Sequence, residues 1–506
     1  MKKKVALHNL GCKVNAYEVE AMQQLLENAG YETVPFEEGA DVYVINTCTV
    51  TNMADRKSRQ MLHRAKKMNP DAVVVAAGCY VQAAAEEAAA DEAIDIIIGN
   101  NQKKDLVNIL ENFRKGEKSK TECSCDGDCG DDCTCKEKPE SQEAPAAELA
   151  SMSEEEFAAS VHETRKYLKD LTHEKEYEEL KITHTTEHTR AYIKVQDGCN
   201  QFCSYCIIPF VRGRVRSRKQ EDVLAEVRGL AEKGFQEVVI TGIHLSSYGM
   251  DFIGETDGDY LKNGKDLRGT AFERAYLVSL LEEIAKVDGI RRIRLGSLEP
   301  RIITEEFAGR LAAIPQLCPH FHLSLQSGCN ETLKRMNRHY TAEEYYEKVQ
   351  ILRKYFEHPA ITTDVIVGFP GETAEEFAVT KTFLEKVHFF EMHIFKYSRR
   401  KGTVADKLPG QLTDAQKTER SGQLLALEKE QSREFRAHYL GQEVEVLIEE
   451  QKEIGGKVYW LGHTDTYVKA AFAADSAECM DYSNRLVHGR AVSFLSDEVL
   501  EIALNF

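Results

Sequence analysis

The stretch Gly198-Cys199-Asn200-Gln201-Phe202-Cys203-Ser204-Tyr205-Cys206 holds three cysteines in the spacing C-x3-C-x2-C. No further cysteine lies within the next hundred residues on its C-terminal side. Cubane iron–sulfur clusters are normally held by four thiolates. Three thiolates on one tight loop would leave one iron without a protein ligand and open to a small molecule. Gly198 allows the backbone to turn where the loop begins.

A structural zinc site is the alternative for these thiols, because zinc is usually bound by four cysteine or histidine ligands. His184 and His188 form an H-x3-H pair upstream of the cysteines. The run 190–196 between them reads as a β-strand, which would carry the histidines away. The residues favour an iron–sulfur cluster and keep zinc as the second interpretation.

Six strand-like segments alternate with helical segments between residues 190 and 425. The strands are expected at 191–196, 237–241, 292–295, 320–325, 361–367 and 393–397. Repeated strand–helix units predict a partial (β/α)6 barrel with its chemistry at the carboxyl ends of the strands. The cysteine loop follows the first of these strands, which is where that rule places function. We expect this barrel to occupy residues 185–430.

The first 115 residues predict a separate open α/β domain with buried parallel strands. Cys12, Cys48 and Cys79 each follow one of its apolar strand segments. The carboxyl ends of parallel strands share one edge of a sheet, so these cysteines are expected to converge as ligands of a second cluster. Ordinary buried cysteines in a core are the alternative.

Residues 116–180 form a third segment, an acidic insert followed by an expected linker helix from 153 to about 180. It carries 19 acidic and 8 basic side chains, so it contributes −11 to the net charge of −18. The remainder, at −7, can still bind RNA through a local basic patch. Five cysteines of the insert could bind a metal or belong to a disordered segment: Cys123, Cys125, Cys129, Cys133 and Cys135.

The last segment, 440–506, contains several short strand-like runs with turns between them, which predicts a small β-barrel. No apolar run approaches the roughly 20 residues of a membrane span, and the apolar part of the opening MKKKVALHNLGCK is too short for a signal peptide. A cytoplasmic location without a membrane partner is therefore expected. Fourteen cysteines then indicate metal or redox chemistry in place of disulfides.

The run GCNQFCSYCIIPFVRGRVRSR, residues 198–218, resembles the signature of the radical S-adenosylmethionine (SAM) methylthiotransferases. The resemblance covers residues 3–112 and 188–504. The opening HNLGCKVNAYEVEAM, residues 8–22, is most similar to the branch that modifies threonylcarbamoyladenosine in tRNA. The family combines an N-terminal α/β domain, a partial barrel and a terminal RNA-contacting β-barrel.

This resemblance implies two [4Fe-4S] clusters and SAM as cofactors. Cys199, Cys203 and Cys206 would hold the catalytic cluster, and Cys12, Cys48 and Cys79 the auxiliary one. The implied reaction places a methylthio group on carbon 2 of N6-threonylcarbamoyladenosine at position 37 of tRNA and consumes two SAM. The implied partners are the anticodon loop and a reductant such as flavodoxin or ferredoxin.

Other site residues are expected at the ends of the barrel strands. The SAM contacts would come from Thr241, Gly242, Ser324, Gln326, Asp364 and Gly368. Phosphate contacts with tRNA would come from two basic runs at the mouth of the barrel, through Arg212, Arg214, Arg399 and Arg400.

Two other functions remain open at this stage. The same chemistry could act on isopentenyladenosine in tRNA or on an aspartate of a ribosomal protein. A non-catalytic iron–sulfur or metal-storage protein is the alternative from another class.

Overall fold

A computed structural model describes residues 2–121, 164–185, 189–253, 275–474 and 480–504. The chain forms two compact units. The first comprises Met1–Leu10, Ala21–Cys48 and Asp55–Lys169, and the second comprises Gly11–Glu20, Thr49–Ala54 and Asp170–Phe506.

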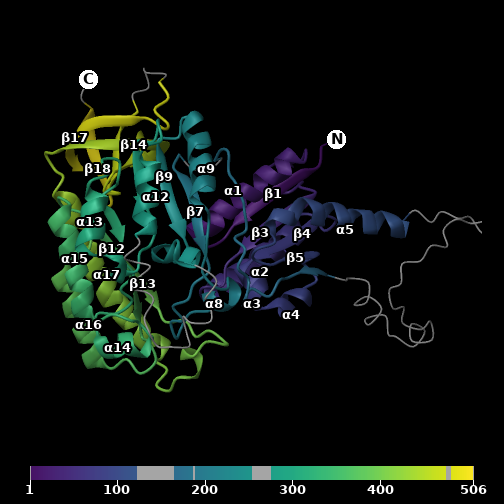
Figure 1. Cartoon of the computed structure of the whole chain (residues 1–506), viewed down its shortest axis with the longest axis horizontal. Helices are drawn as coiled ribbons and strands as arrows, with labels where there is room; N and C mark the ends of the chain where they lie inside the picture. The colour runs from purple at the N-terminus through teal and green to yellow at the C-terminus, as the bar shows by residue number, and fades with distance from the viewer. Residues whose placement is uncertain (1, 122–163, 186–188, 254–274, 475–479, 505–506) are drawn as a thin grey trace, which may run out of the picture. The chain divides into compact units, whose positions relative to one another are not determined.

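The first unit contains a six-stranded sheet in the order β2-β1-β3-β4-β5-β6, and every neighbouring pair is parallel. Figure 1 shows β3, β4 and β5 side by side. The runs VYVINT and VVVAAG are buried at every position, as expected for strands covered on both faces. The strands are β1 (Lys4–Asn9), β2 (Glu32–Thr33), β3 (Val42–Thr47), β4 (Val73–Gly78), β5 (Ile96–Ile98) and β6 (Arg165–Tyr167).

Six helical segments accompany the described residues of this part of the chain. They are α1 (Lys13–Asn28), α2 (Asn52–Met68), α3 (Cys79–Ala83), α4 (Ala85–Ala89), η1 (Lys103–Asp105) and α5 (Leu106–Thr121).

The second unit contains six parallel strands in two sheets, β10-β9-β7 and β11-β12-β13, with β8 antiparallel at the edge of the first. Parallel bridges from Ile293 to Leu317 and from Leu298 to Leu323 connect the two sheets. This arrangement confirms the predicted partial barrel. Its strands are β7 (Ala191–Asp197), β8 (Arg216–Ser217), β9 (Glu237–Gly242), β10 (Arg292–Leu295), β11 (His320–His322), β12 (Ala360–Val367) and β13 (Glu391–Lys396).

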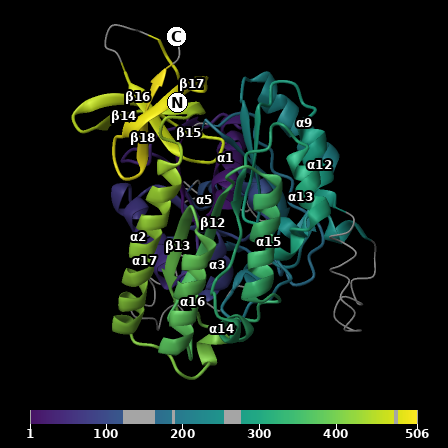
Figure 2. The same ribbon diagram turned by 90° about the vertical axis from the view of Figure 1, so that its left-hand side faces the viewer.

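Helices flank these strands, and Figure 2 shows α15, α16 and α17 next to one another beside β12 and β13. Three of the helices begin with a Thr capping box: α15 at Thr341, α16 at Thr373 and α17 at Thr413. The α-helices are α8 (Ile208–Val211), α9 (Gln220–Glu232), α12 (Tyr276–Ile284), α13 (Glu305–Ala312), α14 (Asn330–Arg335), α15 (Ala342–Tyr355), α16 (Ala374–Val387) and α17 (Asp414–Ala437). The 3-10 helices are η2 (Leu245–Ser247), η3 (Met250–Ile253), η4 (Pro300–Ile302) and η5 (Ala405–Lys407).

The C-terminal segment closes into a barrel in the order β14-β15-β16-β18-β17, which confirms the predicted small β-barrel. The strands are β14 (Glu443–Ile454), β15 (Lys457–Thr464), β16 (Lys469–Ala473), β17 (Leu486–Phe494) and β18 (Val499–Leu504). Arg292 on β10 anchors this barrel, since its guanidinium donates to the Glu445 carbonyl at 2.8 Å and to the His463 carbonyl at 3.0 Å.

The linker helix expected up to residue 180 is wrong for its described part. Residues 165–167 form β6, which pairs with β5, and residues 168–180 are irregular. Pairing with the edge of a parallel sheet outweighed the helical tendency of this charged stretch. Residues 153–163 and the five cysteines between 123 and 135 lie outside the described residues. Within the described part of the chain, none of the helices combines the length and apolarity that crossing a bilayer requires.

Candidate active site

The cysteine loop leaves β7 through a turn that only glycine can make. Gly198 has φ +70°, and a Cβ there would lie 1.8 Å from the carbonyl oxygen of Arg214. The Cys199 amide donates to the Gly213 carbonyl at 3.0 Å, so the loop is held against the segment that follows it. The Phe202 backbone is also left-handed, with φ +51°. This close backbone packing fixes where the three thiols start.

Burial makes the thiols of this loop hard to ionise on their own. It raises the pKa of Cys199 to about 12 and raises that of Cys206 further, with the neighbouring Cys203 thiol acting in the same direction. A buried thiolate therefore needs a positive partner. Arg338 supplies one directly, since its guanidinium lies 3.3 Å from the Cys203 sulfur. Iron ions would supply the rest, because a coordinating thiol is deprotonated.

The sulfur atoms of the cysteine loop do not all lie as close together as the ligands of a single zinc ion. Among the described residues, one set of three potential ligands has all its donor atoms within 4.8 Å of one another, and it contains none of the three cysteines. Sulfur ligands of one tetrahedral zinc lie only about 3.8 Å apart, given zinc–sulfur bonds of about 2.3 Å. His188, the second histidine of the zinc alternative, lies outside the described residues.

The expected SAM residues on β9 lie against the start of the cysteine loop. Gln196 at the end of β7 donates to the Gly198 carbonyl at 2.7 Å and accepts from the His244 amide at 2.7 Å. A Cβ on Gly242 would lie 2.9 Å from the Gln196 side chain, so this contact requires glycine. Thr241 precedes it and is buried. Gln196 thereby ties the β7 and β9 ends into one rigid edge.

The remaining expected SAM residues lie on the β11-β12 side. Gln326 has a left-handed backbone, φ +73°, and its amide donates to the Asp364 carbonyl at 2.8 Å. The Ser324 carbonyl accepts from the Arg338 guanidinium at 3.1 Å. Gly368 has φ +71° and packs on Lys417 so closely that a Cβ would lie 2.4 Å from its Cγ. Arg338 contacts both the Cys203 sulfur and Ser324, so it links the two halves of the site.

The cysteines of the N-terminal sheet occupy equivalent strand ends. Thr47 is the last residue of β3 and pairs with Gly78, the last residue of β4. Cys48 directly follows Thr47, and Cys79 directly follows Gly78. Asn100 donates to the Cys79 sulfur at 3.6 Å and accepts from the buried Lys103 ammonium at 2.8 Å. The Asn100 side chain therefore connects the Lys103 ammonium to the Cys79 sulfur through two hydrogen bonds. Cys12 follows β1 three residues after its end, in a segment of the second unit.

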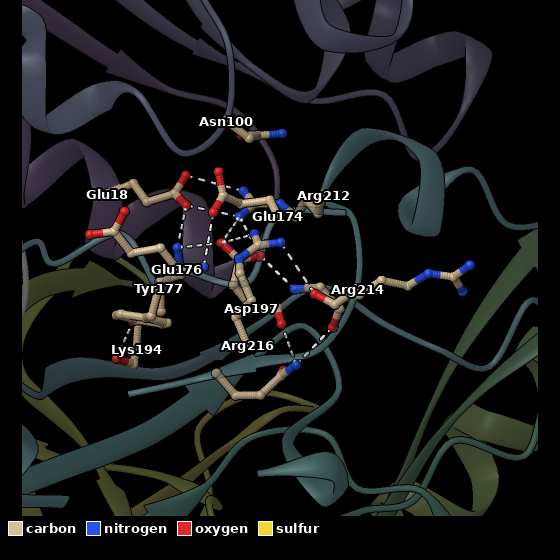
Figure 3. A network of polar contacts seen from close by, with 12 residues as sticks. Glu18, Asn100, Glu174, Glu176, Tyr177, Lys194, Asp197, Arg212, Arg214 and Arg216 are labelled. Carbon is tan, nitrogen blue, oxygen red and sulfur yellow. Dashed lines mark hydrogen bonds and ion pairs between the residues drawn. The ribbon is translucent and has the colours of Figure 1, made fainter. Parts of the chain in front are cut away.

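Arg212 is wrong as an RNA contact, because its side chain is fully buried. It forms ion pairs with Glu18 at 2.8 Å and Asp197 at 3.1 Å, and Lys194 completes this network by contacting the same two carboxylates. Figure 3 shows the four side chains pointing toward one another, whereas Arg214 points away. Burial alone raises the pKa of Asp197, but Lys194 and Arg212 outweigh it and hold that pKa below its ordinary range. An arginine in such a network is committed to the fold.

Arg400 is wrong for the same reason. Only 7% of the residue is exposed, and its guanidinium donates to Thr49 and to Asn52. The Arg399 side chain is 61% exposed and pairs with Asp406 at 2.6 Å. Arg214 is half-buried and lies over the Phe202 ring, 4.5 Å from its centroid. Among the four expected RNA contacts, these two have side chains that a tRNA could reach.

Sequence reasoning missed Arg338, Asn100 and Gln196, which support the cysteines and the strand ends. Arg338 and Asn100 act on sulfur atoms far away in sequence, and Gln196 joins Gly198 to the distant His244, so no local spacing marks these residues. The weak signal for Gln196 was its place one residue before Asp197-Gly198 at the end of a buried strand.

Comparison with known proteins agrees with this geometry. The profile described as "Uncharacterized protein family UPF0004" matches residues 4–99, and that of the radical SAM superfamily matches residues 193–384. The solved structure of the radical SAM methyltransferase TsrM from Kitasatospora setae, with cobalamin and a [4Fe-4S] cluster bound, has the same fold. Its TM-score is 0.51 at 16% identity, over 80% of this chain and 74% of that one.

Curated relatives match over nearly the whole length. The chain is 37% identical to the threonylcarbamoyladenosine tRNA methylthiotransferase MtaB of Bacillus subtilis, over 92% of this chain and 90% of the relative. It is 36% identical to MtaB of Aquifex aeolicus, over 89% and 94%. It is 33% identical to the tRNA-2-methylthio-N(6)-dimethylallyladenosine synthase of Moorella thermoacetica, over 87% and 85%. Identity at this level along nine-tenths of the chain shows that the protein belongs to the radical SAM methylthiotransferases of the MtaB type.

Proposed function

We propose that this enzyme methylthiolates carbon 2 of N6-threonylcarbamoyladenosine at position 37 of tRNA. The observation that carries the proposal is the 37% identity to a threonylcarbamoyladenosine methylthiotransferase over 92% of the chain. The three-cysteine loop at the end of β7 supports it, because three thiolates would leave one iron of a [4Fe-4S] cluster without a protein ligand. A cytoplasmic enzyme with tRNA as its substrate follows from this assignment.

The chain's own residues position the reactants. Cys199, Cys203 and Cys206 would hold a [4Fe-4S] cluster, which would supply the electron for reductive cleavage of SAM. Thr241 and Gly242 then present the edge of β9, and Ser324 and Gln326 present polar groups beyond β11. Gly368 allows close approach of a flat purine ring to the backbone. Asp364 contributes through its carbonyl, which fixes the strained Gln326.

From the family relationship, we also propose that Cys12, Cys48 and Cys79 hold a second cluster. Cys48 and Cys79 follow adjacent parallel strands, and Asn100 with Lys103 supports the Cys79 thiol. In the proposed reaction, SAM provides the methyl carbon of the methylthio group but not its sulfur atom. The sulfur must come from another source, and the second cluster is the proposed carrier. A reductant of the flavodoxin or ferredoxin class would supply the electrons.

Arg214 and Arg399 are the proposed tRNA contacts. Arg214 and Phe202 stack, and Phe210 lies edge-on to Phe202 at 6.2 Å with 61% of its surface exposed. Exposed aromatic rings and guanidinium planes bind unstacked bases of single-stranded loops. We therefore assign the surface formed by Phe202, Phe210 and Arg214 to the anticodon loop.

The test is nucleoside analysis of tRNA from a host strain that lacks its own methylthiotransferases and expresses this chain. The expected product is 2-methylthio-N6-threonylcarbamoyladenosine, detected by mass spectrometry, and a Cys203→Ala variant should give none. If the 2-methylthio derivative of isopentenyladenosine were the only product, the substrate assignment would be overturned. The activity named for the Moorella enzyme would then be favoured. Release of 5′-deoxyadenosine by purified, reduced protein separates a catalyst from a metal-storage protein.

A further inference from the structure

Three metal-ligating side chains, none of them a cysteine, meet on the inner face of the barrel. They are His322 on β11, Asp364 on β12 and His393 on β13, and their donor atoms all lie within 4.8 Å of one another. The strand register explains the meeting, because His322 pairs with Thr362 and Asp364 pairs with His393. Residues two apart on a strand share a face, so Thr362 and Asp364 point to the same side. Neighbouring strands about 4.8 Å apart then bring the three together.

This face is the one that the cysteine loop covers. Ile366, two residues beyond Asp364, packs in the same apolar cluster as Tyr205 of the loop. Thr363, on the opposite face, donates to the Leu323 carbonyl and interacts with Tyr345 of helix α15. The three ligands therefore lie inside the barrel, on the side of the strands turned away from α15.

The geometry of His322 also fits a metal ligand. Its Nδ1 contacts the Thr362 hydroxyl at 3.0 Å, which fixes the ring and directs Nε2 toward Asp364. Nε2 is buried and makes no hydrogen bond, although the Asp364 carboxylate lies 3.3 Å away. Two ligands of one tetrahedral ion, each about 2.1 Å from it, are about 3.4 Å apart. The Nε2 to Oδ2 distance therefore matches the edge of a coordination tetrahedron.

We propose that His322, Asp364 and His393 bind one divalent transition-metal ion, such as Zn²⁺ or Fe²⁺, in addition to the iron–sulfur clusters. Two imidazoles and a carboxylate are ligands that these ions accept with a further position left open. His393 is exposed and the Asp364 side chain is 28% exposed, so a water or another oxygen donor can reach that position. Thr362 acts as the outer partner that holds the His322 ring. The site goes beyond the proposed methylthiolation and does not depend on it.

The experiment counts zinc in enzyme whose clusters are already loaded. Protein with reconstituted clusters is incubated anaerobically with Zn²⁺, freed of unbound metal and analysed for zinc and iron per chain. The wild type should retain about one zinc more than each of three variants, His322→Gln, Asp364→Asn and His393→Gln. The matched control His488→Gln changes an exposed histidine paired with Glu445 and should retain the wild-type amount. Equal zinc in wild type and all three variants would overturn the proposal.

Two further measurements guard against misfolding and against zinc on the insert cysteines. His393 is exposed, so His393→Gln should keep the full iron content while losing the zinc. X-ray absorption should show nitrogen and oxygen neighbours for the zinc that the wild type holds and the variants lack. Sulfur neighbours for this zinc would contradict the assignment. Thr362→Val should weaken zinc binding about tenfold without abolishing it, because it removes only the outer partner. Unchanged tRNA products with a lost zinc would leave the methylthiolation assignment intact.

Discussion

Arg338 shows how one residue can tune the site from outside the cysteine motif. Its guanidinium lies 3.3 Å from the Cys203 sulfur and also donates to Ser324 and Tyr340. Hydrogen bonds and positive charge near cluster sulfurs stabilise the reduced, more negative state. Arg338→Met should therefore lower the reduction potential of the cluster by about 60 mV, which corresponds to a loss of about 1.4 kcal/mol.

The measurement is a redox titration followed by electron paramagnetic resonance. A background carrying Cys48→Ala and Cys79→Ala removes the proposed auxiliary cluster, so that one cluster is observed. Arg335→Met is the matched control, since the Arg335 guanidinium donates to Glu376. The same potential in Arg338→Met and wild type would remove this role.

His244 predicts a pH dependence of stability. Burial lowers its pKa to about 4, with Glu299 opposing and Arg338 and Arg301 assisting the shift. The unfolded chain binds this proton near pH 6.5, but the folded chain does so only near pH 4. The free energy of unfolding therefore falls as the pH drops from 6.5 to 4, by about 2 kcal/mol between pH 7.5 and 5.

Urea denaturation of the apoprotein at pH 7.5 and pH 5 tests this shift. His244→Gln should lose about 2 kcal/mol less than the wild type over this range, because its side chain does not titrate. His488→Gln, at an exposed site, should follow the wild type. Parallel losses in His244→Gln and wild type would contradict the assignment to His244.

Residue roles could be predicted only where chemistry and local spacing coincide. Cys199, Cys203 and Cys206 could be proposed as cluster ligands from the sequence because C-x3-C-x2-C is compact and the reactive atoms belong to the motif itself. Arg212 and Arg216 were grouped with Arg214 as one basic run, yet the first two are fully buried. Arg212 is buried because it pairs with Glu18, which lies 194 residues away in sequence. The sequence alone does not show that these two residues meet, so it could not separate the buried arginines of this run from the accessible one.

At the scale of the element, the cysteine loop depends on one glycine. Gly198→Ala would force a Cβ to within 1.8 Å of the Arg214 carbonyl, where both atoms are held by backbone. The loop must then shift, and iron content should fall by about four ions per chain as the cluster is lost. Chemical iron analysis of anaerobically purified protein measures this.

Gly229→Ala is the control for this substitution. Gly229 lies within helix α9 and a Cβ there meets nothing within 4 Å. The variant should keep its iron and gain up to about 1 kcal/mol of stability, because alanine is the better helix former. Full iron content in Gly198→Ala would show that the turn tolerates a side chain.

Strands with apolar sequences were predicted more reliably than strands with charged sequences. Apolar runs such as residues 42–47 and 73–78 are buried on both faces, so they identify buried strands without any knowledge of neighbours. In the terminal barrel, Leu486–Phe494 forms one continuous strand, β17, and Val499–Leu504 forms β18. Residues 165–167 carry a charged sequence that becomes a strand only because the β5 edge offers hydrogen bonds. Such pairing is set by tertiary structure and leaves little trace in local composition.

At the scale of the molecule, an acidic enzyme must bind an acidic substrate. The net charge is −18, and basic side chains such as Arg212 and Arg292 are committed to internal ion pairs. Arg292 and Arg294 bind the terminal barrel through backbone carbonyls at 2.7 to 3.2 Å. Affinity for tRNA must then come from few phosphate contacts and from stacking, with a shallow dependence on salt.

Arg214→Ala and Arg399→Ala should each weaken tRNA binding several-fold and reduce the salt slope of log Kd by about one contact. Phe210→Ala should weaken binding by about 1 kcal/mol with no change of slope, because stacking releases no counterions. Lys354→Ala is the matched control, as Lys354 is a 62% exposed basic residue paired with Glu305. Filter binding from 50 to 200 mM salt gives both quantities, and SAM cleavage without tRNA should match the wild type in every variant. If Arg214→Ala and Arg399→Ala bound tRNA with wild-type affinity and slope, the anticodon loop would have to meet another surface of the enzyme.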